Sequence, residues 1–138
     1  MQPTLNENNR ILVNKASIYF SSFHHGNVEI IKTEDVPTYY VKRIIGLPGD
    51  NVQLRNDVLY INGKKRDELY IQLDMSQVSN RFSNCREMKV PKHKLFVLVE
   101  NRNHSKDSRN TLGLIDESNI IGKVKLVSYP FDQIKWLK

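Results

Sequence analysis

The chain has 138 residues, of which 39% are hydrophobic, 26% charged and 9% aromatic, a composition that suits one globular domain and excludes a disordered chain. It contains no apolar run near the ~18 residues needed to cross a bilayer, and its single cysteine excludes an internal disulfide. The net charge of +6 suits either an anionic partner or an ordinary basic surface.

Short runs rich in β-branched and aromatic residues recur between turn signals, whereas helical periodicity is rare. These runs predict strands at residues 10–14, 27–32, 38–45, 51–54, 58–61, 95–100 and 120–129. Asn62-Gly63 suits a tight hairpin turn, and Pro48-Gly49 predicts another turn. Residues 111–119 suit a helical turn, and residues 130–138 suit either a helix or a strand. The sequence therefore predicts an antiparallel, mainly-β domain.

The histidines lack the spacing of a metal site. His24 and His25 are adjacent, so in an extended chain their side chains point to opposite faces, and His93 and His104 lie far from them in the sequence. The sequence also has no glycine-rich phosphate loop. We therefore expect no metal and no cofactor.

Three segments carry a more specific pattern. They are Met1-Gln2-Pro3-Thr4-Leu5, YVKRIIGLPGD at residues 40–50 and NRNHSKDSR at residues 101–109. Their order and content resemble the type I signal peptidases, membrane-tethered serine endopeptidases that remove signal peptides from exported proteins. The family pattern reads S-M-x-P-T-L, then K-R-x-x-G-x-P-G-D, then G-D-N-R-x-x-S-x-D-S-R. The resemblance covers nearly the whole chain.

The resemblance implies a lobed antiparallel β fold, with a β-sheet catalytic core and a smaller inserted β lobe. Between residues 67 and 92 the strand pattern loosens, and polar residues such as Ser76, Asn80 and Ser83 interrupt it. Such a stretch predicts a long excursion or a lobe between two better-patterned halves. We expect the core at residues 1–54 and 93–138, and the inserted lobe at residues 55–92.

By the same resemblance, Lys42 is the general base. A serine hydroxyl needs an adjacent base, but a free lysine with a pKa near ~10.4 keeps its proton at neutral pH. An apolar enclosure destabilises the ammonium and lowers that pKa, and Tyr40, Val41, Ile44 and Ile45 beside Lys42 suit such an enclosure. Periodicity alone favours the alternative, a lysine on the exposed face of a strand.

The resemblance also assigns supporting roles. Ser105 matches the serine that hydrogen-bonds the lysine and orients it, the alternative being a generic loop serine. Arg43 would pair with Glu100, and Asp107 and Arg109 would belong to an ion-paired structural cluster. These four residues then support the site without taking part in the chemistry.

Substrate binding follows from strand physics, because an extended signal-peptide end can add itself to an exposed strand edge. Shallow pockets then admit the small side chains of an A-x-A-type cleavage site. By resemblance Met1, Leu5, Tyr40 and Val41 line those pockets, although each also suits an ordinary core. The expected partners are signal peptides of exported preproteins and the membrane surface, with no nucleic acid. The expected location is the outer face of the bacterial cytoplasmic membrane, reached through an N-terminal tether.

The reactive serine of the pattern immediately precedes the methionine that is Met1 here, so we expect this 138-residue polypeptide to be inactive. Three explanations stay open: a chain cut or mis-started inside a complete gene, a soluble piece of an anchored enzyme, and a degenerate relative that binds export substrates without cutting them. Within the chain, Val99-Glu100-Asn101 replaces G-D-N, and three residues rather than two separate Arg109 from Gly113.

Two rival functions are weaker. A self-cleaving repressor-type protease shares the serine–lysine chemistry but would carry a DNA-binding segment. A basic β-domain that binds nucleic acid would need a base-stacking stripe, which the aromatic positions do not form. Near the end of the chain, Phe131 and Trp136, with Lys135 beside them, suit either a membrane contact or core packing.

Overall fold

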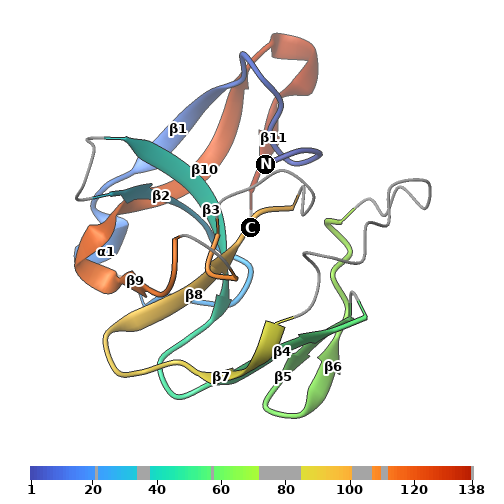
Figure 1. The fold of residues 1–138 in the computed structure, drawn as a ribbon. Helices are drawn as coiled ribbons and strands as arrows, with labels where there is room; N and C mark the ends of the chain where they lie inside the picture. Colours follow the sequence, from blue (N-terminus) through green and yellow to red (C-terminus); the bar gives the residue numbers. More distant parts are fainter. Residues whose placement is uncertain are drawn as a thin grey trace.

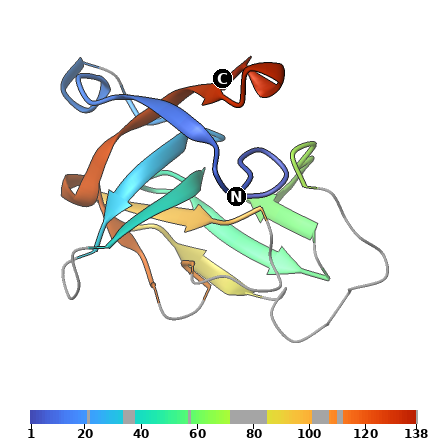
Figure 2. The same ribbon diagram turned by 90° about the horizontal axis from the view of Figure 1, so that it is seen from above.

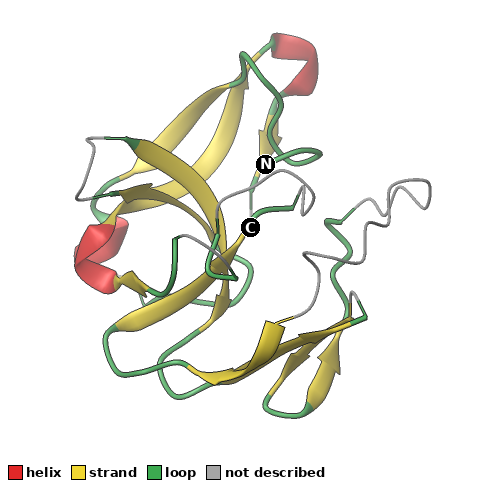
Figure 3. Ribbon diagram, viewed as in Figure 1, coloured by secondary structure: helices red, strands yellow, loops and turns green. Residues whose placement is uncertain are grey.

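This computed structural model describes residues 1–20, 22–33, 38–56, 58–71, 85–100, 107–109 and 112–137. Ser105, the predicted orienting serine, lies outside these ranges. The described residues form two antiparallel β-sheets with a few short helical turns (Figure 1, Figure 3). The mainly-β prediction is therefore confirmed.

The larger sheet has the strand order β1-β10-β2-β3-β8-β9, and β11 pairs with β10 beside this path. Its strands are β1 (Arg10–Asn14), β2 (Val28–Lys32), β3 (Tyr39–Gly46), β8 (Lys94–Leu98), β9 (Ile115–Asp116), β10 (Ile120–Tyr129) and β11 (Lys135–Trp136). Helix α1 (Ser17–Phe20) and two 3-10 helices, η2 (Glu117–Asn119) and η3 (Phe131–Gln133), connect them.

The smaller sheet has the order β6-β5-β4-β7 and lies at the bottom of Figure 1. Its strands are β4 (Asn51–Arg55), β5 (Val58–Ile61), β6 (Lys64–Arg66) and β7 (Cys85–Lys89). The chain enters this sheet after β3 and returns to the larger sheet at β8, as the view from above also shows (Figure 2). The expected division into a core at residues 1–54 and 93–138 and a lobe at residues 55–92 stays a prediction. It assigned most of β4 to the core, whereas β4 pairs with β5 and β7 in the smaller sheet.

Local sequence explains most of these elements. A strand forms in each of the seven predicted runs, although the run at 95–100 already ends at Leu98. Asn62 and Gly63 have φ values of 53° and 75° between the paired strands β5 and β6, which confirms the predicted hairpin turn. The run at 130–138, for which either a helix or a strand was expected, contains both a 3-10 turn and the short strand β11, while β6, β7 and β9 were not predicted.

The two sheets share a core. Ile45, Phe96 and Leu98 from the larger sheet pack with Val52 and Leu59 from the smaller one. Gly46 lies where β3 passes between the sheets, and a Cβ there would come within 2.5 Å of Val52 Cγ2. A glycine at this position therefore permits the close packing of the sheets.

The N-terminal segment packs against the larger sheet. Leu5 joins Val28, Val124 and Val127 in a buried cluster, and Met1 packs against it. No helix in the described ranges is long and apolar enough to cross a membrane.

Candidate active site

Lys42 lies in the middle of β3 and is buried, with 4% of its surface exposed. The ladder between β2 and β3 covers Tyr39–Arg43, whereas the ladder between β3 and β8 begins at Arg43. Lys42 therefore lies just before β8 joins the ladder. Its Nζ lies 5.2 Å from the centre of the Tyr40 ring. The sheet thus encloses an ammonium that strand periodicity alone would place in solvent.

This burial changes the acidity of Lys42. Desolvation lowers its pKa from 10.5 to about 8, while the Asp107 charge raises it and the Arg109 charge lowers it. At pH 7, Lys42 is then unprotonated in roughly a tenth of the molecules, a far larger fraction than for a lysine in water. Lys42 can accept a proton near neutral pH.

The amino terminus lies within electrostatic reach of Lys42. Burial lowers the pKa of the Met1 α-amino group, while the charge of Glu100 raises it and the charge of Lys42 lowers it. The Met1 carbonyl accepts a hydrogen bond from the Leu5 N–H at 2.8 Å, which closes a turn. The turn therefore holds the Met1 α-amino group within range of the Lys42 charge.

A hydrogen-bond network around Glu100 holds this N-terminal turn. The Glu100 carboxylate forms an ion pair with Arg43 and also accepts bonds from the backbone N–H and the hydroxyl of Thr4. Arg43 donates to Thr4 Oγ1 at 3.2 Å and to the Gly26 carbonyl at 2.6 Å. The Glu100 side chain is fully buried and that of Arg43 is 10% exposed. The network links Thr4 to β3 next to Lys42.

Asp107 and Arg109 form a second buried ion pair. Arg109 donates from Nε to Asp107 Oδ1 at 2.9 Å and from Nη2 to Asp107 Oδ2 at 2.8 Å. Ser108 fastens this segment to β8, because its hydroxyl accepts a bond from the Val97 N–H and its own N–H donates to the Val97 carbonyl. The charges of this segment therefore act on Lys42 from a fixed position.

Comparison with known proteins identifies the family. Residues 1–129 match the family model described as signal peptidase, peptidase S26. The chain belongs to this signal peptidase family. The family consists of serine endopeptidases, and membership supports removal of signal peptides as the activity of the chain.

The relatives cover the whole chain. Signal peptidase I S of Bacillus subtilis (strain 168) is 43% identical over 140 residues, which span 98% of this chain and 75% of that protein. Signal peptidase I P of Bacillus subtilis subsp. natto is 40% identical over 142 residues, which span 100% of this chain and 77% of that protein. The crystal structure of a signal peptidase I from Enterococcus faecalis V583 superimposes with a TM-score of 0.63 at 28% identity, covering 75% of this chain and 97% of that one.

Within this signal peptidase, sequence reasoning missed a buried carboxylate at Glu29. It is 2% exposed on β2, and burial raises its pKa to about 7. Although Lys42 is its backbone partner on β3, the cations that lower its pKa are Lys123 and Lys125. A charged residue within the run Val28–Lys32 was the signal that could have revealed it.

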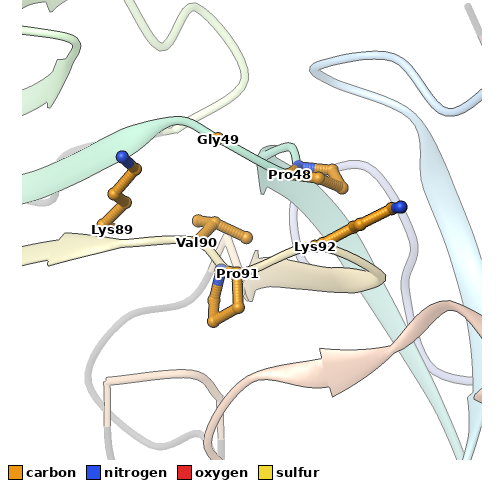
Figure 4. Close-up of a pocket in the computed structure, with 6 residues that line it drawn as sticks. All are labelled: Pro48, Gly49, Lys89, Val90, Pro91 and Lys92. Carbon is orange, nitrogen blue, oxygen red and sulfur yellow. The ribbon is translucent and has the colours of Figure 1, made fainter.

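A cavity of about 550 Å³ lies between Pro48-Gly49 and residues 89–92, and none of the predicted site residues lines it (Figure 4). Lys89 and Lys92 are among the residues that line it. Within the described ranges, no three histidine, cysteine or acidic side chains gather into a group that could hold a metal ion.

Proposed function

We propose that this signal peptidase removes signal peptides from exported preproteins with Lys42 as the general base for a serine hydroxyl. The observation that carries the proposal is the buried Lys42 ammonium, with its pKa lowered to about 8, beside the N-terminal turn. In the family pattern the serine immediately precedes the methionine that is Met1 here. That position would present its hydroxyl to Lys42 Nζ.

The reaction then has two stages. The serine Oγ attacks the scissile carbonyl while Lys42 takes its proton, and the protonated lysine passes that proton to the departing amine. A water molecule, deprotonated by Lys42, then attacks the acyl-enzyme. The ester bond to the serine breaks, the protonated lysine returns this proton to the departing serine Oγ, and the signal peptide leaves with a new carboxyl end. Lys42 starts and ends the cycle unprotonated, so its lowered pKa serves both stages.

We assign the remaining site residues as supports. Arg43 and Glu100 hold the N-terminal turn, and Asp107 with Arg109 fixes the charges that face Lys42. Ser105 orients the lysine in this proposal by its match to the family pattern alone, since it lies outside the described residues.

For the substrate, we place the extended cleavage segment beside β3 near Tyr40 and Val41. β3 is joined to β8 only from Arg43 onward, which supports an added strand before that point. Leu5 is 7% exposed, and Met1 and Val41 pack against its cluster, so these three side chains belong to one apolar cluster next to β3. We assign Met1, Leu5, Tyr40 and Val41 to the pockets for the small side chains of an A-x-A site by their match to the family pattern.

The membrane surface is a proposed partner of the C-terminal region. Phe131 and Trp136 are 79% and 74% exposed, which rules out core packing, and Ile134 and the exposed Lys135 lie beside them. Aromatic and lysine side chains together favour the membrane interface. We place the enzyme on the outer face of the bacterial cytoplasmic membrane, where preproteins emerge.

The experiment compares three polypeptides with an exported precursor as substrate. The first carries a serine before Met1, together with the upstream segment of a signal peptidase I relative; the second has alanine at that serine; the third starts at Met1. We expect cleavage after the A-x-A site by the first alone, because only it has the hydroxyl.

Lysine variants of the serine-containing polypeptide test the base. Lys42→Ala should abolish cleavage, whereas Lys65→Ala, on the exposed strand β6, should leave it unchanged. Binding of the precursor without cleavage by the serine-containing polypeptide would instead favour a degenerate relative that acts as a binding protein. Full activity of Lys42→Ala would reject Lys42 as the base.

A further inference from the structure

Tyr70 follows β6 of the smaller sheet, but its ring contacts Arg43 on β3, the strand that carries Lys42. Its ring centre lies 4.1 Å from Arg43 Cζ, well within the ~6 Å range of a cation–π contact. In Figure 1 the segment after β6 runs upward from the smaller sheet on the side of the molecule where the N-terminal turn lies. This contact therefore joins the two parts of the molecule next to the proposed site.

The local structure holds this ring in place. The Tyr70 hydroxyl donates to Glu68 Oε1 at 2.8 Å, and the Ile71 N–H donates to the Glu68 carbonyl at 3.0 Å. The ring also packs against the core cluster shared by the two sheets. Leu69, by contrast, is 97% exposed, so the turn presents Tyr70 inward.

The guanidinium under this ring is the centre of the Glu100 network. Arg43 donates to Thr4 Oγ1 and is ion-paired with the fully buried Glu100, whose carboxylate also binds the Thr4 N–H. Such a buried pair is strong only where water is kept away and the geometry is fixed. The Tyr70 ring covers the guanidinium and so shields the pair.

We propose that Tyr70 is a positioning residue of the peptidase reaction, which acts through Arg43 and Glu100 to hold Thr4 and thus the chain before Met1. This inference rests on the proposed function, because it assumes a serine attached at Met1. Removing the ring would admit water to the ion pair and loosen the N-terminal turn. A nucleophile displaced by about 1 Å can lose up to ~10²-fold in rate.

The test uses the serine-containing polypeptide with three substitutions. Tyr70→Leu removes the ring, Tyr70→Phe keeps the ring but removes the hydroxyl, and Tyr60→Leu removes a matched ring that lies 5.2 Å from Arg55 in the smaller sheet. We expect Tyr70→Leu to lower kcat roughly tenfold with KM within about twofold. Tyr70→Phe and Tyr60→Leu should keep kcat within about twofold of the parent. Both retain the ring over Arg43, and in Tyr70→Phe the packing against the core cluster still holds that ring after the hydrogen bond to Glu68 is lost.

A second measurement does not depend on activity. Hydrogen exchange at the Thr4 amide, which donates to Glu100 at 2.9 Å, should accelerate in Tyr70→Leu and stay unchanged in Tyr70→Phe and Tyr60→Leu. A reduced kcat with unchanged Thr4 exchange would overturn the route through Glu100. An equal loss in Tyr70→Phe would overturn the role of the ring.

The outcomes separate this inference from the proposed function. If Lys42→Ala abolishes cleavage while Tyr70→Leu keeps full kcat, the function stands and the positioning role fails. If the parent does not cleave at all, the proposed function fails, and the Thr4 exchange rates still decide whether Tyr70 holds the N-terminal turn.

Discussion

Glu100 accepts a hydrogen bond from the Thr4 backbone N–H at 2.9 Å, although 96 positions separate the two residues in the chain. This bond fastens the N-terminal turn to the segment that follows β8, and the ion pair of Glu100 with Arg43 links both to the strand that carries Lys42. Where the family pattern has aspartate, the longer glutamate side chain still reaches both Arg43 and Thr4. The departure from G-D-N is therefore compatible with an ordered site.

The first prediction concerns the pH dependence of cleavage by the serine-containing polypeptide. Lys42 must be unprotonated to act as a base, and its pKa is lowered to about 8. We expect kcat/KM to rise about tenfold per pH unit below this value and to level off above it. Initial rates from pH 6 to 10 measure this profile. A flat profile would count against Lys42.

The second prediction concerns the Glu100 ion pair. Glu100→Gln leaves the Arg43 guanidinium buried without its counter-charge, which should lower the free energy of unfolding by about 3–5 kcal/mol. Asp116→Asn is the matched control, because it breaks the 2.8 Å ion pair with Lys94 at the surface, where the Asp116 side chain is 43% exposed and that of Lys94 is 36% exposed. This substitution should change the free energy of unfolding by less than ~1 kcal/mol. Urea unfolding measures both, and equal effects would contradict the role of burial.

The third prediction concerns Glu29, whose pKa is about 7 in the folded state against 4.5 ordinarily. Between these values the folded state holds the proton more tightly than the unfolded state does, so stability falls as pH rises from 4.5 to 7. Glu29→Gln removes this loss and should become more stable than the parent by up to about 3 kcal/mol at pH 8, with little difference at pH 4.

Urea unfolding at several pH values measures this difference. Glu87→Gln, on the exposed side of β7, is the matched control for the loss of one negative charge. A difference between Glu29→Gln and the parent that does not change with pH would contradict the burial of an ionisable carboxyl.

The fourth prediction concerns the junction between the sheets. Gly46→Ala places a Cβ 2.5 Å from Val52 Cγ2 and 3.1 Å from Phe96 Cβ, so the core must shift, and stability should fall by about 1–3 kcal/mol. Gly63→Asn is the control, because its φ of 75° suits asparagine and a Cβ there meets open space. Thermal unfolding compares the two, and equal stability would contradict the tight packing.

The fifth prediction concerns the exposed aromatic residues near the C-terminus. Replacing both Phe131 and Trp136 by serine should weaken binding to anionic lipid vesicles at least about thirtyfold, since each ring buried in the interface contributes roughly 1–3 kcal/mol. Phe20→Ser, which removes an 88% exposed ring on α1, should leave binding unchanged. Vesicle co-sedimentation measures the affinities, and unchanged binding of the double variant would remove the membrane contact.

Much of the molecule could be predicted from short-range patterns. Strand runs and turn residues act over a few positions, so Asn62-Gly63 predicted its hairpin correctly. Strand β7 was missed in the loosely patterned stretch between residues 67 and 92. Its residues 85–89 carry little β-strand pattern, and the strand depends on pairing with β4. Tyr70 and Glu29 also escaped notice, because neither lies in a recognisable motif.

The sequence by itself determined the β class, the turns and the family, because each depends on residue types at fixed short spacings. The family resemblance also predicted an apolar enclosure for Lys42 and a pair between Arg43 and Glu100, whereas strand periodicity alone favoured an exposed lysine, because the pattern along one strand does not record what packs over it. Only the tertiary structure showed that Thr4 joins the Arg43–Glu100 pair and that the Tyr70 ring lies over Arg43. Desolvation depends on chain segments distant in sequence, and these come together only when both sheets have folded.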